Sequence, residues 1–183
     1  MSQNILIKRG TRSIPHLSKI DVIIVSVDYN DFLPITLENN IKIFDSITVV
    51  TSINDEECQK ICQDFNVNCV VTERMYENGA KFNKGKAINE GIKSLKKPEW
   101  IILLDADIYL QSDFLEVLKT KELNYQDLVV CKRLILDNYD LFLEWQDNKS
   151  VGRLERAKGF GFFQMFNIKK FPRNLKIFPE NSN

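Results

Sequence analysis

The stretch EWIILLDADIYLQ, residues 99 to 111, is an apolar run that ends at two aspartates, Asp105 and Asp107, with one alanine between them. A run that is continuously apolar, rather than alternating, is typical of a strand buried on both faces of a parallel sheet. The stretch therefore predicts a buried strand over residues 99–105 that carries two carboxylates at its carboxyl end.

Three earlier apolar runs have the same character, and the segments that follow them have helical spacing. The runs are DVIIVSV, SITVVTS and VNCVVTE, at residues 21–27, 46–52 and 67–73, and the helical segments cover residues 31–44, 54–65 and 81–98. Strict alternation of strand and helix predicts an α/β domain with right-handed crossovers and a mostly parallel sheet.

The pattern changes after residue 105. We expect a helix over 113–123, a strand over 127–136, a turn or helix over 137–148 and a last strand over 159–168, with an irregular tail from 171 to 183. These segments predict a mixed sheet with an added antiparallel strand. The domain is expected to cover residues 21–183, and residues 1–20 are expected to form an N-terminal extension.

Composition excludes several classes of function. The 183 residues carry 25 basic and 25 acidic side chains, so the broad positive field typical of nucleic-acid binding is missing. No apolar window approaches the roughly 20 residues of a membrane span, and a cytoplasmic protein without a transmembrane segment is expected. Four loosely spaced cysteines and one distant histidine fit reduced thiols better than a zinc site.

The spacing of Asp105 and Asp107 favours a divalent cation. Ligands of open α/β sheets bind beyond the carboxyl ends of the strands, and carboxylate oxygens suit Mg²⁺ or Mn²⁺. Two carboxylates are too few for a closed site, so water or a substrate diphosphate would supply the other ligands. Turn or capping chemistry is the alternative, although Asp113 with Glu116 has the capping-box spacing for the next helix.

The segment NKGKAINEGI, residues 83 to 92, precedes this strand and favours an anion. Asn83 is a candidate helix cap, and Lys84 and Lys86 add positive charge near the start of the helix. Gly85 and Gly91 indicate close approach to a neighbour or a ligand. Plain packing of small residues against the sheet is the alternative. A P-loop is excluded because Ala87 stands where the metal-binding hydroxyl belongs.

In this order, VDYNDFLPITLENN, VVTSINDEE, FNKGKAINEGI and WIILLDADIYL resemble the GT-A glycosyltransferases, in particular family-two-like enzymes, over roughly residues 20 to 180. The resemblance implies a Rossmann-like three-layer sandwich. It also implies a nucleoside-diphosphate-sugar donor, by family habit a UDP-sugar, and Mn²⁺ or Mg²⁺ held by Asp105 and Asp107.

The resemblance also implies a set of donor-binding residues. Near the nucleoside, it places residues of the loop after the first strand and two positions after the second: Asp28, Tyr29, Asn30, Thr51 and Asp55. In the helix that borders the donor pocket it places Lys84, Gly85 and Asn89. Asp105 of the aspartate motif and Gln164, on the sugar or acceptor side, complete the set.

Family-two enzymes are similar in inverting the sugar, with an acidic side chain as the base that deprotonates an acceptor hydroxyl. In that family the base, and a late histidine of many members, come from a C-terminal portion, which we expect to be reduced or missing here because no histidine follows His16. The late acidic candidates are Glu155, Asp140 and Glu180. Three alternatives stay open: a truncated or degenerate domain that binds nucleotide without turnover, a domain completed by a partner chain, and an interaction module. The acceptor is not indicated.

Overall fold

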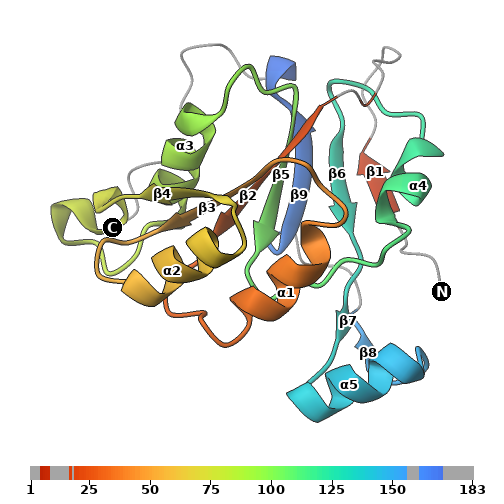
Figure 1. The fold of residues 1–183 in the computed structure, drawn as a ribbon. Helices are drawn as coiled ribbons and strands as arrows, with labels where there is room; N and C mark the ends of the chain where they lie inside the picture. Colours follow the sequence, from red (N-terminus) through yellow and green to blue (C-terminus); the bar gives the residue numbers. More distant parts are fainter. Residues whose placement is uncertain (1–4, 9–16, 18, 156–160, 171–183) are drawn as a thin grey trace.

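The computed structural model describes residues 5–8, 17, 19–155 and 161–170 of the chain. Within these residues the strands form a seven-stranded sheet of order β1-β6-β9-β5-β2-β3-β4 and a separate β7-β8 pair (Figure 1). The strands are β1 (Ile5–Lys8), β2 (Ile20–Val25), β3 (Ile47–Thr51), β4 (Asn68–Val71), β5 (Trp100–Asp105), β6 (Leu128–Cys131), β7 (Leu134–Ile135), β8 (Arg153–Leu154) and β9 (Phe163–Asn167).

The four predicted strands of the first half are confirmed as β2, β3, β4 and β5, and their neighbouring pairs are parallel. The chain moves outward from β2 through β3 to β4 and then returns to place β5 on the other side of β2. The order of strands therefore reverses between β2 and β5, which is the ligand-binding position of an open α/β sheet.

The second half completes a mixed sheet. The predicted last strand is confirmed as β9, which lies antiparallel between β5 and β6 rather than at an edge. Because β5 and β6 are both antiparallel to β9, they run in the same direction. The strand predicted over 127–136 is divided into β6, in the main sheet, and β7, which pairs with β8. Residues 5–8, within the predicted extension, form β1 against β6.

Helices cover both faces of the sheet. On one face, α1 (Leu33–Asn40), α2 (Glu56–Asp64) and α4 (Phe114–Lys119) pack in one core cluster. On the other, η1 (Arg74–Gly79) and α3 (Lys84–Ser94) pack in a second cluster. The arrangement is the predicted three-layer sandwich (Figure 1). The helix α5 (Tyr139–Asp147) and the β7-β8 pair form a lobe below the sheet, and a short η2 (Ile168–Lys170) follows β9.

Side-chain caps begin two of the predicted helices. Asp55 accepts a hydrogen bond from the backbone N–H of Cys58 at the start of α2, and Asn83 accepts one from Lys86 at the start of α3. The capping prediction for Asp113 is wrong, because its side chain makes no cap bond to α4 and its Oδ1 is buried without a described partner.

The close approach predicted for Gly91 is confirmed. A Cβ placed there would lie 2.8 Å from Val50 Cγ2 and 3.0 Å from Ile23 Cγ2, so only a glycine lets α3 approach β2 and β3 this closely. All four cysteines are free thiols, as expected. Among the described residues, no helix combines the length and the apolar character needed to cross a bilayer.

Candidate functional site

The site lies where the carboxyl ends of β5, β2 and β3 meet. Val25, the last residue of β2, is paired in register with Asp105, the last residue of β5. The crossover helix α3 contributes its first residues, Lys84 and Gly85, to the same region. This convergence of strand ends and a helix start is what the sequence predicts.

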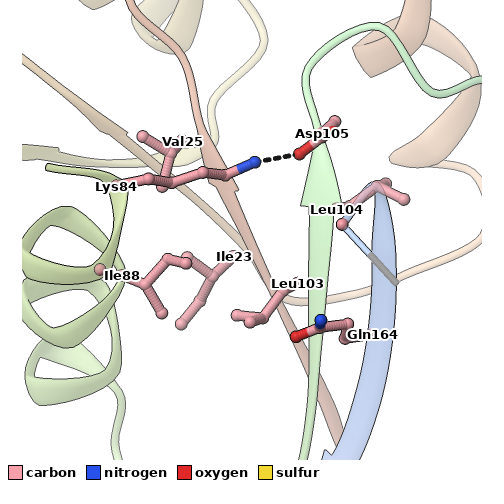
Figure 2. A pocket seen from close by; sticks show the side chains of 10 residues that line it. Ile23, Val25, Lys84, Ile88, Leu103, Leu104, Asp105 and Gln164 are labelled. Carbon is pink, nitrogen blue, oxygen red and sulfur yellow. Dashed lines mark hydrogen bonds and ion pairs between the residues drawn. The ribbon is translucent and has the colours of Figure 1, made fainter. Parts of the chain in front are cut away.

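A cavity of about 230 Å³ opens here between α3 and the strands β2, β5 and β9 (Figure 2). Most of its wall is apolar, and three of the predicted donor-binding side chains, those of Lys84, Asp105 and Gln164, supply polar groups. The lining residues are Ile23, Val25, Lys84, Gly85, Ile88, Leu103, Leu104, Asp105, Gly161 and Gln164.

Asp105 and Lys84 form an ion pair at this cavity. The Lys84 Nζ donates to Asp105 Oδ1, and the dashed line in Figure 2 shows the lysine side chain reaching from α3 toward β5. The Asp105 side chain is 30% exposed and the Lys84 side chain is 42% exposed, so both remain accessible to solvent and to a ligand. The ion pair thus joins the acidic end of β5 to the basic start of α3, two motifs that are separate in the sequence.

Asp107 lies beside this pair but does not line the cavity. The expectation that both carboxylates point into one crevice is therefore confirmed for Asp105 alone. Asp107 is exposed and makes no ion pair with a described residue. Desolvation by the surrounding protein and then the charge of Asp105 raise the pKa of Asp107, while the charges of Arg133 and Lys84 act in the opposite direction.

Buried side chains of α1 hold the loop that carries Asp107. Thr36 Oγ1 donates to the carbonyl of Ala106 at 2.7 Å, and Asn40 Nδ2 donates to the carbonyl of Ile108 at 3.0 Å. Asn40 Oδ1 also accepts from the backbone N–H of Leu110 at 3.3 Å. Residues on either side of Asp107 are thus fixed to a helix about 70 positions earlier. Sequence reasoning missed these supports.

The residues predicted near a nucleoside gather around the Asp55 carboxylate. It accepts from the backbone N–H of Asp28 at 2.9 Å, from Asn30 Nδ2 at 3.1 Å and from Thr51 Oγ1 at 3.4 Å. Asp28 has a positive φ of 59°, so its N–H is held in a left-handed turn. Asp55 is only 6% exposed, and it therefore organises this loop from within.

Two other predicted donor-binding residues have different surroundings. The side chain of Tyr29 is 45% exposed, next to the Asp28 turn, so its ring is open to a ligand. Asn89 is buried in α3 and does not line the cavity. The structure thus brings Asp105 at the strand end together with Lys84 and Gly85 at the helix start, whereas Asn89 does not reach the cavity.

A metal ion would find two carboxylates here. Within the part of the chain that the structure describes, no group of three or more His, Cys, Asp or Glu side chains is placed to hold a metal. Asp105 and Asp107 carry carboxylate oxygens, the type of ligand that Mg²⁺ and Mn²⁺ take, and Mg²⁺ usually keeps waters or substrate phosphates in its shell. Such a site needs a ligand to be complete.

Comparison with known families gives a decisive match. Residues 21–177 match the family described as "Glycosyl transferase family 2". The chain belongs to glycosyl transferase family 2. The matched range runs from the second residue of β2 past the end of β9, and so includes the described residues of the site. No curated protein matches the sequence significantly.

Solved structures similar to this family 2 chain include two sugar-phosphoglycerate synthases. Glucosyl-3-phosphoglycerate synthase from Mycobacterium tuberculosis, in complex with uridine diphosphate, is 13% identical with a TM-score of 0.43, and the match covers 54% of this chain and 37% of that one. Mannosyl-3-phosphoglycerate synthase from Rubrobacter xylanophilus is 14% identical with a TM-score of 0.44, covering 52% and 33%. The matches span about a third of the length of those chains.

The late acidic residues of this family 2 chain differ in their surroundings. Glu155 is bound by Arg133, with 2.6 Å between Nε and Oε2 and 3.3 Å between Nη2 and Oε1. Asp140 is exposed in the first turn of α5, and Glu180 lies outside the described residues. Arg133 was not predicted: its guanidinium lies 4.7 Å from the Phe162 ring centroid, and Glu155, then Asp107 and Asp105, raise its pKa. No sequence motif marks this residue.

Proposed function

We propose that this chain transfers a sugar from a nucleoside-diphosphate-sugar donor, a UDP-sugar by family habit, with Mn²⁺ or Mg²⁺ held by Asp105 and Asp107. One observation carries the proposal: an accessible carboxylate and an accessible lysine meet at the strand-order reversal of a family 2 domain, with a second carboxylate beside them. A diphosphate with its cation is complementary to this mixture of charges.

The residues present support distinct parts of such a reaction. When bound, the cation would neutralise the charge that develops on the departing diphosphate. Asp105 and Asp107 would hold it, with their backbone fixed by β5 and by the α1 contacts to Ala106 and Ile108. Lys84, at the first turn of α3, adds a positive charge where the diphosphate oxygens would lie.

The Asp55 cluster is proposed to hold the nucleoside. Its Asp28 turn and the exposed ring of Tyr29 lie at the end of β2, directly beside β5. The Asn30 Oδ1 is buried and accepts no hydrogen bond from a described residue, so the loop would have to shift before this oxygen could accept from a base N–H. A planar base could also pack against the accessible Tyr29 ring.

Neither Glu155 nor Asp140, the two described candidates for the base, lines the cavity. Glu155 is poorly placed as a base while Arg133 donates to both of its oxygens, since these oxygens are already engaged. This pairing favours the second candidate function, in which the domain binds a nucleotide without turnover by itself. Asp140 and Glu180 stay predictions, as do the inverting stereochemistry, the acceptor and a contribution from a partner chain.

Thermal unfolding with added ligand tests the proposal. UDP with Mn²⁺ should raise the Tm, because ligand at 100 times its Kd adds about 2.7 kcal/mol to the free energy of unfolding. Asp105→Asn and Asp107→Asn should remove most of this gain. GDP and UDP without metal serve as controls for nucleotide and cation dependence.

The possible results separate the competing functions. A shift with UDP and Mn²⁺ together with release of UDP from a UDP-sugar supports a transferase. A shift without turnover supports the nucleotide-binding domain. An interaction module is favoured if no nucleoside diphosphate, with or without Mn²⁺, changes the Tm.

A further inference from the structure

Lys84 occupies the place at Asp105 that a cation would need. Its ammonium donates to Asp105 Oδ1, and the side chain runs from α3 toward β5 along the apolar residues of the cavity (Figure 2). Asp107 forms no ion pair with a described residue and stays exposed. The two carboxylates therefore differ in the metal-free protein: one has a resident positive charge and the other does not.

We infer that Lys84 is a built-in competitor of the metal ion, which makes the site bind the cation strongly only together with a diphosphate. This inference rests on the proposed function. A divalent cation at Asp105 Oδ1 must displace the ammonium, and a cation at the other oxygen would stay a few ångströms from a like charge. Either way, Lys84 lowers the affinity of the metal ion for the site without nucleotide.

A diphosphate removes this competition. Its oxygens offer the ammonium new partners and at the same time supply ligands to the cation. When the Lys84 ammonium turns from Asp105 to the diphosphate, the Asp105 carboxylate becomes free to bind the cation that accompanies the diphosphate. Metal and nucleotide must then tighten each other's binding by the same factor, as linkage requires.

The surroundings of the two lysines of the K-G-K sequence show why Lys84 is suited to this exchange. The Lys84 side chain is 42% exposed, and its only described ionic partner is Asp105. Lys86, two residues later, is only 4% exposed and lies 3.4 Å from Glu77 Oε2. Lys86 is therefore fixed in the structure, whereas Lys84 can turn about its flexible stem toward a ligand.

The test measures Mn²⁺ binding without nucleotide, by electron paramagnetic resonance of the free ion, and then repeats it with UDP. Lys84→Met should bind Mn²⁺ alone about three- to tenfold more tightly than the wild type, since a positive charge beside Asp105 is removed. It should bind UDP more weakly, and the tightening of Mn²⁺ by UDP should be smaller than in the wild type.

Two variants control for charge and for folding. Lys93→Met removes a lysine from the same helix, 56% exposed and paired with Glu90, and should leave Mn²⁺ affinity unchanged. Lys84→Arg keeps the positive charge and should keep weak binding of Mn²⁺ alone. Circular dichroism melts in EDTA verify that each variant is folded.

The results separate failure of the inference from failure of the proposed function. If Lys84→Met binds Mn²⁺ alone no more tightly than the wild type, while the wild type still binds UDP with Mn²⁺, Lys84 is not a competitor and the donor site stands. If the wild type binds neither Mn²⁺ nor UDP in any combination, both ideas are wrong. If Lys84→Met and Lys93→Met raise the Mn²⁺ affinity by the same factor, the cause is a general effect of lost positive charge, and the inference is overturned.

Discussion

Asn40, in the last turn of α1, donates a hydrogen bond from its side-chain amide to the carbonyl of Ile108 over 3.0 Å. The asparagine is fully buried, and its Oδ1 accepts from the backbone of Leu110. One side chain thus satisfies two backbone groups of the loop that follows Asp107. The position of a proposed metal ligand therefore depends on a helix far away in the sequence.

Asn40→Ala should leave these backbone groups buried and unpaired. We expect a loss of about 2–3 kcal/mol in the free energy of unfolding, or roughly 4–12 °C in Tm for a chain of this size. Binding of Mn²⁺ with UDP should also weaken, because the Asp107 loop loses its support. Glu38→Ala, on the exposed side of the same helix, is the control, and equal Tm values for the two variants would contradict the role of Asn40.

Asp55→Ala should affect both α2 and the proposed nucleoside loop. The substitution removes the helix cap and the partners of the Asp28 and Asn30 donors, so a loss of about 2–3 kcal/mol is expected in urea unfolding. Asn138→Ala removes a similar cap from α5, at an exposed position away from the cavity, and should cost about 1 kcal/mol. UDP affinity should fall for Asp55→Ala only. An equal fall in both variants would indicate a general effect of destabilisation.

Asp107→Asn should stabilise the metal-free protein slightly at neutral pH. The raised pKa of Asp107 means that the folded state disfavours its charged form, so stability rises as the pH falls through the folded-state pKa toward the ordinary value. We expect a gain of at most about 2 °C in Tm at pH 7 in EDTA, because solvent screens this exposed group. The difference in Tm between Asp107→Asn and the wild type should become smaller as the pH is lowered, because the wild-type carboxylate is then protonated as well.

The same substitution should remove the gain in Tm from UDP with Mn²⁺. Asp105→Asn is the matched control, since it deprives Lys84 of its partner and is not expected to stabilise the metal-free protein. A lower Tm for metal-free Asp107→Asn at pH 7 would contradict the assigned direction of the pKa shift.

Gly91→Ala should destabilise the protein although alanine favours helices. The added methyl would lie 2.8 Å from Val50 Cγ2 and 3.0 Å from Ile23 Cγ2, and such overpacking costs about 1–3 kcal/mol. A net fall of about 2–8 °C in Tm is expected by calorimetry. Lys93→Ala, on the exposed side of α3, should change Tm little, and a rise in Tm for Gly91→Ala would show that β2 and β3 adjust easily.

Local patterns are sufficient to predict most elements of the fold. Continuous apolar runs identify β2, β3 and β5, because these strands are buried on both faces. The same pattern identifies β4, although its residues at the sheet edge are exposed or half-buried, so burial on both faces was not a correct expectation there. Caps such as Asp55 and Asn83 are readable because they act on backbone groups only three positions away. Asp113 shows the limit of this reasoning, since suitable spacing does not ensure a hydrogen bond.

The site is predictable only in its outline. The pair of aspartates at a strand end and the basic helix start identify Asp105 and Lys84, because both follow from the order of strands and helices. Their mutual ion pair is not predictable, since it joins positions 21 residues apart whose distance is set by the packing of α3 on the sheet. Arg133 lies near the same carboxylates through the β6–β7 connection, which no motif marks.

By itself, the sequence determined the α/β alternation, the acidic end of β5 and the capped start of α3, since periodicity and capping act over a few residues. Only the tertiary structure decided that Asp105 lines a cavity while Asp107 does not, that Lys84 is the partner of Asp105, and that Asn40 supports Ile108 across 68 positions. These relationships depend on side chains that the packing of the whole domain brings together, and local residue preferences do not predict which distant residues come into contact.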